Sequence, residues 1–170
     1  SIKHTKVIGV AGNQVTNDIR ESLGIVTDEA EKLKKQYGYA LEEAIIKDED
    51  IYIKGVGARG NIKIPISLLT QIIHVRMKEL FTLIDNELRQ TGFKNKTKAG
   101  IVLTGGGSLL KGVTELAEEV FGQPTRIGVP LELGAGLSNE IESPEFATVA
   151  GLKRRGTSTN RPPNKVNIKK

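Results

Sequence analysis

Apolar residues recur at helical spacing along one long stretch of the chain, residues 67–90. They repeat every three or four positions, and Gly92 follows them as a stop signal. The pattern predicts one long amphipathic helix with Ser67 as its N-cap residue. The positions that we assign to its apolar face are Leu68, Ile72, Val75, Met77, Leu80, Phe81, Leu83, Ile84 and Leu88.

Two shorter helices are predicted ahead of this long one. The first covers about residues 13–23 and ends before Gly24, and the second covers residues 27–37 and ends at Gly38. Thr27 is the expected N-cap of the second helix, because a threonine hydroxyl accepts a hydrogen bond from a backbone N–H of the first turn.

Short apolar runs bounded by turn residues predict strands between the helices. The further predicted elements are strands at residues 6–11, 51–56, 62–66, 99–104 and 125–129, and helices at residues 41–46, 109–121 and 145–152. Strands 51–56 and 62–66 would form a hairpin, and strand 99–104 would be buried. Asp48, Glu49 and Asp50 are interpreted as a solvated turn. Because strands alternate with helices, the sequence predicts an α/β fold.

Composition excludes several kinds of chemistry. The chain has 170 residues, of which 38% are hydrophobic and 26% charged, and it has no cysteine. Disulfides, thiolate metal sites and cysteine nucleophiles are therefore ruled out. No apolar run approaches the roughly 20 residues needed to cross a bilayer. His4 and His74 lack the spacing of a metal site, so we predict no metal site and interpret His74 as a helix-surface residue. We assign no catalytic residue.

Positive charge is concentrated at the C-terminal end of the chain. The net charge is +5, yet residues 153–170 alone carry seven basic residues and no acid, which leaves about −2 on the rest. The body is therefore not a basic platform for nucleic acid. The tail is either a disordered, solvated extension or a polybasic segment for an acidic membrane or partner.

A run of three glycines, Gly105, Gly106 and Gly107, follows predicted strand 99–104 and precedes a predicted helix. Glycines let a ligand approach the backbone closely, and a helix N-terminus offers unpaired N–H groups. The spacing matches neither a P-loop nor G-x-G-x-x-G. A tight structural turn and a ligand cradle both remain open, and Ser108 is interpreted as the cap of the following helix.

Glu31 and Lys34 stand three residues apart on predicted helix 27–37, so they share one face. One interpretation is an exposed ion pair within the helix, which contributes little to stability. The other is a pair of polar side chains that bind the hydroxyl groups of a ribose.

Four stretches of the chain together resemble the FtsA family of bacterial cell-division proteins, which belongs to the actin-like superfamily. They are residues 10–19 with 29–34 and 37–38, residues 73–80, residues 99–112 (Ala-Gly-Ile-Val-Leu-Thr-Gly-Gly-Gly-Ser-Leu-Leu-Lys-Gly), and residues 118–128 with 136–138 and 143–152. The glycine stretch alone would also fit MreB-type or Hsp70-type proteins. The run Val-Phe-Gly-Gln-Pro-Thr-Arg-Ile-Gly and the ending Pro-Glu-Phe-Ala-Thr-Val-Ala-Gly-Leu favour FtsA.

The resemblance implies an actin-like, ribonuclease H-like fold, of which this chain is the C-terminal half and supplies the adenosine side of an ATP cleft. Gly105, Gly106 and Gly107 match the glycines that line the adenosine pocket, and Glu31 and Lys34 match the pair that reaches the ribose. The phosphates and Mg²⁺ would be held mainly by loops preceding residue 1. We therefore expect this chain alone to bind nucleotide weakly and to hydrolyse none, while the ATPase activity of the complete protein stays open.

The resemblance also implies partners. Arg76 falls in the subdomain that in this family binds the C-terminal peptide of the tubulin-like protein FtsZ. A guanidinium can clamp a carboxylate with two hydrogen bonds, although a solvated helix charge is the alternative. Self-association into filaments and contacts with other division proteins are implied at the cytoplasmic face of the inner membrane. The amphipathic membrane helix usual in the family is not seen in the tail.

The expected organisation is an adenosine-side core from residues 1–36 and 97–152, an inserted α/β subdomain from residues 37–96, and a disordered basic tail from residues 153–170. Two other functions remain as alternatives. One is an actin-like ATPase of the MreB or Hsp70 type, and the other is an interaction module that binds no nucleotide.

Overall fold

A computed structural model of the chain describes residues 12–55, 60–96 and 99–129. Its elements are α1 (Gly12–Leu23), α2 (Thr27–Tyr37), η1 (Glu42–Ala44), β1 (Asp50–Ile53), β2 (Ile62–Pro65), α3 (Ile66–Gln90), η2 (Lys94–Lys96), β3 (Ile101–Leu103), η3 (Gly106–Leu109), α4 (Val113–Phe121) and β4 (Thr125–Ile127). The mixture confirms the predicted α/β class. Predicted strand 6–11, predicted helix 145–152 and the basic tail lie outside the described residues.

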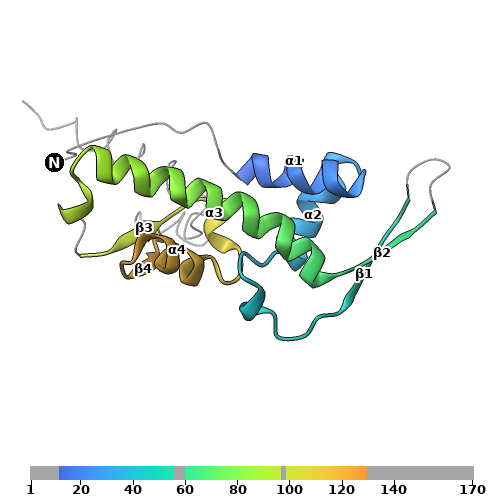
Figure 1. The fold of residues 1–170 in the computed structure, drawn as a ribbon. Coiled ribbons are helices and arrows are strands. Elements are labelled where there is room, and N and C mark those ends of the chain that lie inside the picture. Colours follow the sequence, from blue (N-terminus) through green and yellow to red (C-terminus); the bar gives the residue numbers. More distant parts are fainter. Residues whose placement is uncertain (1–11, 56–59, 97–98, 130–170) are drawn as a thin grey trace, which may run out of the picture.

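The long helix α3 runs across the molecule (Figure 1), and seven of its residues are buried. Helices α1 and α4 both pack against it, and α2 packs against α1. The buried residues of α3 are Ile66, Leu69, Thr70, Ile73, Met77, Phe81 and Asp85. Their spacing of three to four residues places them on one face, where they join the buried residues of α1, α2 and α4 in one hydrophobic core.

The predicted apolar face of α3 is wrong in part. Leu68, Val75 and Leu83 are 40%, 68% and 43% exposed, so they lie outside the core. The helix has apolar residues on two sides, and periodicity alone does not tell which side the neighbouring elements cover. An exposed apolar strip therefore remains on the outer face of α3.

The start of α3 is capped by a residue from far along the sequence. The helix begins at Ile66, so Ser67 is not its N-cap. Instead, the carboxylate of Asp48 accepts a hydrogen bond from Ser67 N at 2.9 Å and another from Ser67 Oγ at 2.7 Å. These hydrogen bonds lower the pKa of Asp48. Asp48 is thus a helix cap rather than part of a merely solvated turn.

Helices α1 and α2 form at the predicted places. Helix α2 begins at Thr27 and ends before Gly38, as predicted, but its N-cap position is Val26 and no side chain caps it. The predicted cap by Thr27 is therefore wrong, because this residue already lies inside the first turn.

The predicted hairpin is present and shorter than expected. Strands β1 and β2 pair antiparallel, with Ile51 opposite Ile64 and Ile53 opposite Ile62. Pro65 ends β2, where its missing N–H interrupts no further pairing. The hairpin extends from the N-terminal end of α3 (Figure 1).

Strands β3 and β4 pair in parallel beside α4. Val102, in the middle of β3, is 48% exposed, so the prediction of a fully buried strand is wrong for the part of the chain described. The helix predicted from residue 109 instead begins at Val113, after a single 3₁₀ turn and after Gly112, whose φ is +74°. The glycine run therefore leads into a short turn and not into the N-terminus of α4.

Candidate functional site

The glycine bend connects β3 to the 3₁₀ turn η3. Gly105 has a φ of +88°, a conformation that strains any residue with a Cβ atom. Gly107 has no such constraint, and a Cβ added there would meet no atom within 4 Å. Ser108 is buried, and its hydroxyl donates to Gly105 O at 2.8 Å, so it closes the turn rather than capping a helix. The backbone beside Gly107 is therefore open to a ligand.

The end of α2 is fastened directly to the segment after the glycine turn. Ala40 N donates to Lys111 O at 2.7 Å, and Lys111 N donates to Gly38 O at 3.2 Å. A Cβ at Gly38 would lie 2.2 Å from Lys34 O and 2.7 Å from a methyl group of Leu110. Glycine at this position thus allows α2 and the glycine turn to meet closely.

Glu31 and Lys34 form an ion pair that also binds α1. Lys34 Nζ lies 2.6 Å from Glu31 Oε2 and donates to Thr16 Oγ1 at 2.8 Å and to Gly12 O at 3.1 Å. These contacts occupy all three ammonium hydrogens, and the Lys34 side chain is only 11% exposed. The pair is therefore not the exposed, solvated pair of one sequence interpretation.

The second carboxylate oxygen of Glu31, Oε1, has fewer contacts than Oε2. Thr16 Oγ1 donates to Oε2 at 2.5 Å, whereas among the described residues Oε1 has only the exposed ammonium of Lys35, 3.8 Å away. Burial raises the pKa of Glu31, but hydrogen bonds from Lys34 and Thr16 and the two lysine charges outweigh it, so the pKa lies below its usual value. Glu31 is thus a carboxylate at neutral pH with one oxygen available as an acceptor.

These features line a single hollow between α1, α2 and the glycine turn. It has a volume of about 450 Å³, within the range of about 300–1,000 Å³ of small-molecule sites. Four of the predicted residues line it: Glu31, Lys34, Gly106 and Gly107. Gly105 does not line it and acts through the bend. The lining residues that the sequence did not single out are Gly12, Asn13, Lys35, Leu109 and Leu110.

Arg76, the predicted partner-binding residue, lies away from this hollow on α3. Its Nε and Nη2 atoms donate to the two carboxylate oxygens of Asp18 on α1, at 2.5 and 3.0 Å, and Nη1 donates to Glu79 at 2.6 Å. Its side chain is 28% exposed. The guanidinium thus already clamps a carboxylate of this chain and joins α1 to α3.

A second hollow, about 420 Å³, lies where α1 meets α3 and includes Arg76. We call it the α1–α3 groove. Leu68, Ile72 and Val75 supply its apolar surface, and Asp18, Glu21, Arg76 and Glu79 its charges. An apolar floor with a charged rim is typical of a surface that binds a peptide helix.

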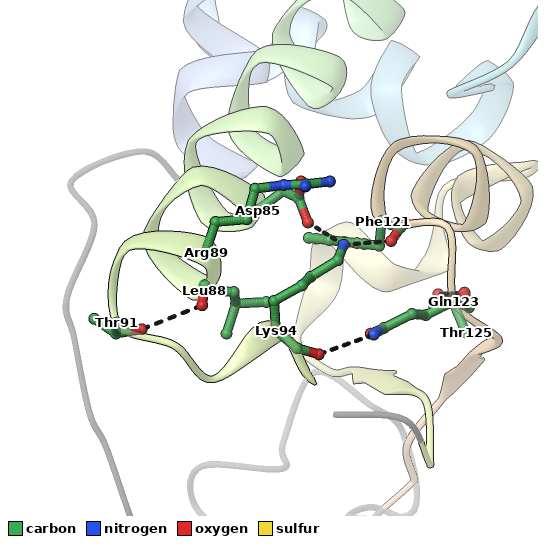
Figure 2. Close-up of polar contacts among 8 residues, drawn as sticks. All are labelled: Asp85, Leu88, Arg89, Thr91, Lys94, Phe121, Gln123 and Thr125. Atoms are coloured by element: carbon green, nitrogen blue, oxygen red, sulfur yellow. Dashed lines mark hydrogen bonds and ion pairs between the residues drawn. The ribbon is translucent and has the colours of Figure 1, made fainter. Parts of the chain in front are cut away.

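The C-terminal end of α3 is fixed to α4 by an ionic cluster around the buried Asp85 (Figure 2). Asp85 is 8% exposed and accepts hydrogen bonds from Arg89 at 2.7 Å and from Lys94. Lys94 also donates to the carbonyl of Phe121 at the end of α4, and its own carbonyl accepts from Gln123 at 3.2 Å. The cluster holds α3 against α4 and against the approach to β4.

Within the described ranges, no group of three or more His, Cys, Asp or Glu side chains could hold a metal ion. In the same ranges, no helix is both long enough and apolar enough to cross a membrane.

Comparison with known proteins gives consistent matches to one family. The family model "Cell division protein FtsA" matches residues 1–151. The chain is 42% identical to the cell division protein FtsA of Pseudomonas aeruginosa over 156 residues, which is 92% of this chain and 37% of that relative. It is 36% identical to FtsA of Escherichia coli K12 over 167 residues, 94% of this chain and 40% of that relative. The chain thus spans well under half the length of these relatives.

Among solved structures, the chain is similar to MreB5 of Spiroplasma citri bound to AMPPNP. The TM-score is 0.74 at 20% identity, and the match covers 94% of this chain and 47% of that one. MreB5 bound to ADP matches with a TM-score of 0.68 at 21% identity, over 89% of this chain and 46% of that one. At this identity the likeness concerns the fold, and it confirms the predicted actin-like architecture. With the family match over residues 1–151, the conclusion is that this chain belongs to the FtsA family of cell-division proteins.

Proposed function

We propose that, in the complete protein, the hollow between α1, α2 and the glycine turn binds the adenosine part of ATP. The observation that carries this proposal is the convergence of Glu31, Lys34, Gly106 and Gly107 on one hollow. These residues come from two segments more than 70 positions apart, and each segment is a candidate ligand-binding motif by its sequence alone. The AMPPNP and ADP bound to the two MreB5 structures of similar fold support the same ligand class.

The contacts suggest different roles for the two members of the ion pair. Lys34 has no hydrogen left to donate, because Glu31, Thr16 and Gly12 take all three. It would therefore hold Glu31 in place, while Glu31 Oε1 accepts a hydrogen bond from a ribose hydroxyl. The open backbone at Gly107 would let the nucleoside lie flat against the glycine turn.

The phosphates and Mg²⁺ would be held mainly by parts of the protein outside this chain. Bound Mg²⁺ would neutralise phosphate charge there. In this proposal the chain binds the nucleoside. Closure of the cleft around the bound nucleotide would regulate assembly at the division ring.

Hydrogen exchange of the complete protein, with and without ATP, locates the nucleotide without any substitution. We expect ATP to slow amide exchange in residues 106–110 and 12–16, which border the hollow, and to raise the melting temperature by mass action. Protection confined to other parts of the protein, with none at these two segments, would contradict the assignment.

We also propose that the α1–α3 groove binds the C-terminal peptide of FtsZ. The exposed Leu68 and Val75, with the partly buried Ile72 between them, would supply most of the contact area. The sequence suggested that the Arg76 guanidinium clamps a peptide carboxylate. In the structure this guanidinium already binds the carboxylates of Asp18 and Glu79. A peptide carboxylate would have to compete with one of these two residues.

Val75→Glu tests the groove better than a change at Arg76, since Val75 is 68% exposed and makes little contribution to the core. We expect binding of a labelled FtsZ tail peptide to weaken about tenfold or more, as is typical for a central interface residue. Leu83→Glu, on the same helix but outside the groove, is the matched control and should leave affinity unchanged. Equal affinities of wild type and Val75→Glu would remove the groove as the site.

A further inference from the structure

A third hollow, about 290 Å³, lies on the other flank of α3, between η1 and the C-terminal part of α4. We call it the η1–α4 hollow. It shares no residue with the proposed nucleotide site. It shares Gln71 and Val75 with the α1–α3 groove, so the two hollows meet over the exposed ridge of α3.

The η1–α4 hollow has an excess of negative charge. Glu42, Glu43 and Glu119 line it, against the single ammonium of Lys78. Lys78 lies 3.4 Å from Glu119, and neither Glu42 nor Glu43 forms an ion pair with any residue in the described part of the chain. Two carboxylates at this rim therefore have no positive partner among the residues that the structure describes.

A buried hydroxyl without a partner lies at the same hollow. Thr70 is 0% exposed and lines it, and Thr70 Oγ1 has no hydrogen-bond partner among the described residues. A threonine inside a helix ordinarily donates to the carbonyl four residues earlier, and an unpaired buried hydroxyl is costly. A ligand in the hollow would give this hydroxyl a partner.

His74 lines the same hollow and adds a nitrogen acceptor to its carboxylates. Its Nδ1 lies 2.9 Å from the carbonyl oxygen of Ala40, so Nδ1 must carry the proton and donate. In the neutral ring Nε2 then has a free lone pair. His74 is thus not the simple surface residue predicted from sequence, since it ties α3 to the segment leading into η1.

From these contacts we infer that the η1–α4 hollow binds the cationic side chain of an arginine or lysine from a protein partner. Glu42, Glu43 and Glu119 supply negative charge around the charged head, and Leu41 and Val75 contact the alkyl stem. A bare metal ion does not fit, because no three ligating side chains converge among the described residues. A peptide is favoured over a free amine because the hollow continues into the α1–α3 groove.

Saturation-transfer NMR on the complete protein tests the inference with two small probes. N-acetylarginine amide carries the proposed cation, and N-acetylcitrulline amide is its neutral isostere. We expect a saturable signal from the arginine probe and little from citrulline. Equal signals from both probes, or no signal from either, would overturn the inference. Neither result depends on ATP or on FtsZ, so its failure is distinct from failure of the proposed function.

Matched variants locate the arginine probe. The double variant Glu42→Gln and Glu119→Gln changes two exposed residues and should weaken binding about threefold or more. Glu115→Gln removes an exposed carboxylate of α4 outside the hollow and should have no effect. Equal affinity in the double variant and in Glu115→Gln would overturn the inference.

Thr70→Val separates binding from folding, because valine has nearly the same shape and removes the unpaired hydroxyl. We expect weaker binding of the arginine probe together with an unchanged or higher melting temperature. Unchanged affinity in this variant would contradict the role assigned to Thr70.

Discussion

At the scale of single residues, glycines at three positions differ in what they permit. Gly38 is closely packed against Lys34 O and Leu110, while Gly107 and Gly60 have no atom within 4 Å of an added Cβ. Of these three glycines, Gly38 is the one that close packing requires. Gly107 lines the proposed nucleotide site, and Gly60 lies at the hairpin and serves as a control.

Gly38→Ala should destabilise the protein by about 1–3 kcal/mol, because its methyl group overlaps both the backbone of α2 and the Leu110 side chain. Gly60→Ala should change the free energy of unfolding by less than about 0.5 kcal/mol. Urea denaturation of the two variants measures the difference. Equal stabilities would show that α2 and the glycine turn do not meet as closely as described.

Residue-scale prediction from the sequence succeeded where one helix carries both partners. Glu31 and Lys34 are three apart, so helical spacing alone identified the pair. Thr16 and Gly12 were out of reach of this argument, because they bind Lys34 across 18 and 22 positions of sequence. The same holds for Asp48, which caps α3 from 19 positions away.

At the scale of elements, the Asp85 cluster decides how α3 is held against α4. Asp85→Ala leaves the part-buried ammonium of Lys94 without its carboxylate. Breaking a fully buried pair costs about 3–5 kcal/mol, so this part-buried pair should cost roughly 2–3 kcal/mol. We expect a loss of this size in chemical denaturation. Asn86→Ala, at the next position of the same helix, changes an exposed residue and should cost much less. A loss below about 1 kcal/mol for Asp85→Ala would contradict the assigned role.

The cluster also predicts a dependence of stability on pH. Burial raises the pKa of Asp85, but hydrogen bonds from Lys94 and Arg89 outweigh it and bring the pKa below its usual value of 3.8. A lowered carboxylate pKa stabilises the folded state above pH 3.8, and this contribution is lost as the pH falls through the lower value. Asp85→Asn should therefore flatten the fall in unfolding free energy below that pH. An unchanged slope in the variant would contradict this account.

The elements themselves were largely predictable because glycines mark their ends. Gly24, Gly38 and Gly92 follow α1, α2 and α3, as the sequence indicated. The orientation of α3 was not predictable, since Leu68, Val75 and Leu83 are as apolar as the residues of the core face. The start of α4 was missed because the 3₁₀ turn at the glycines has no periodic pattern of its own.

At the scale of the whole molecule, the described helices carry three hollows with different proposed ligands. The nucleotide hollow lies between α1, α2 and the glycine turn, while the α1–α3 groove and the η1–α4 hollow lie along α3. Helix α1 borders both the nucleotide hollow and the groove, and Lys34 and Arg76 each bind it. In the proposed function, this shared helix connects the nucleotide hollow to the peptide-binding groove.

The family and the actin-like architecture could be recognised from sequence, because the runs at residues 120–128 and 144–152 narrow what the glycine motif alone leaves open. The set of residues that line the nucleotide hollow could not be predicted from the sequence, since Asn13, Lys35 and Leu109 become neighbours only when α1, α2 and η3 come together. The position of the groove likewise depends on the contact between α1 and α3.

The affinity of the complete protein for ATP, compared between Gly107→Asp and Gly60→Asp, tests the central claim most directly. Both positions are open to a side chain, so both variants should fold, and they carry the same change in charge. We predict that Gly107→Asp weakens ATP binding about tenfold or more, because its carboxylate occupies the space of the nucleoside, while Gly60→Asp binds as wild type. Equal ATP affinity in the two variants would contradict the assignment of the hollow.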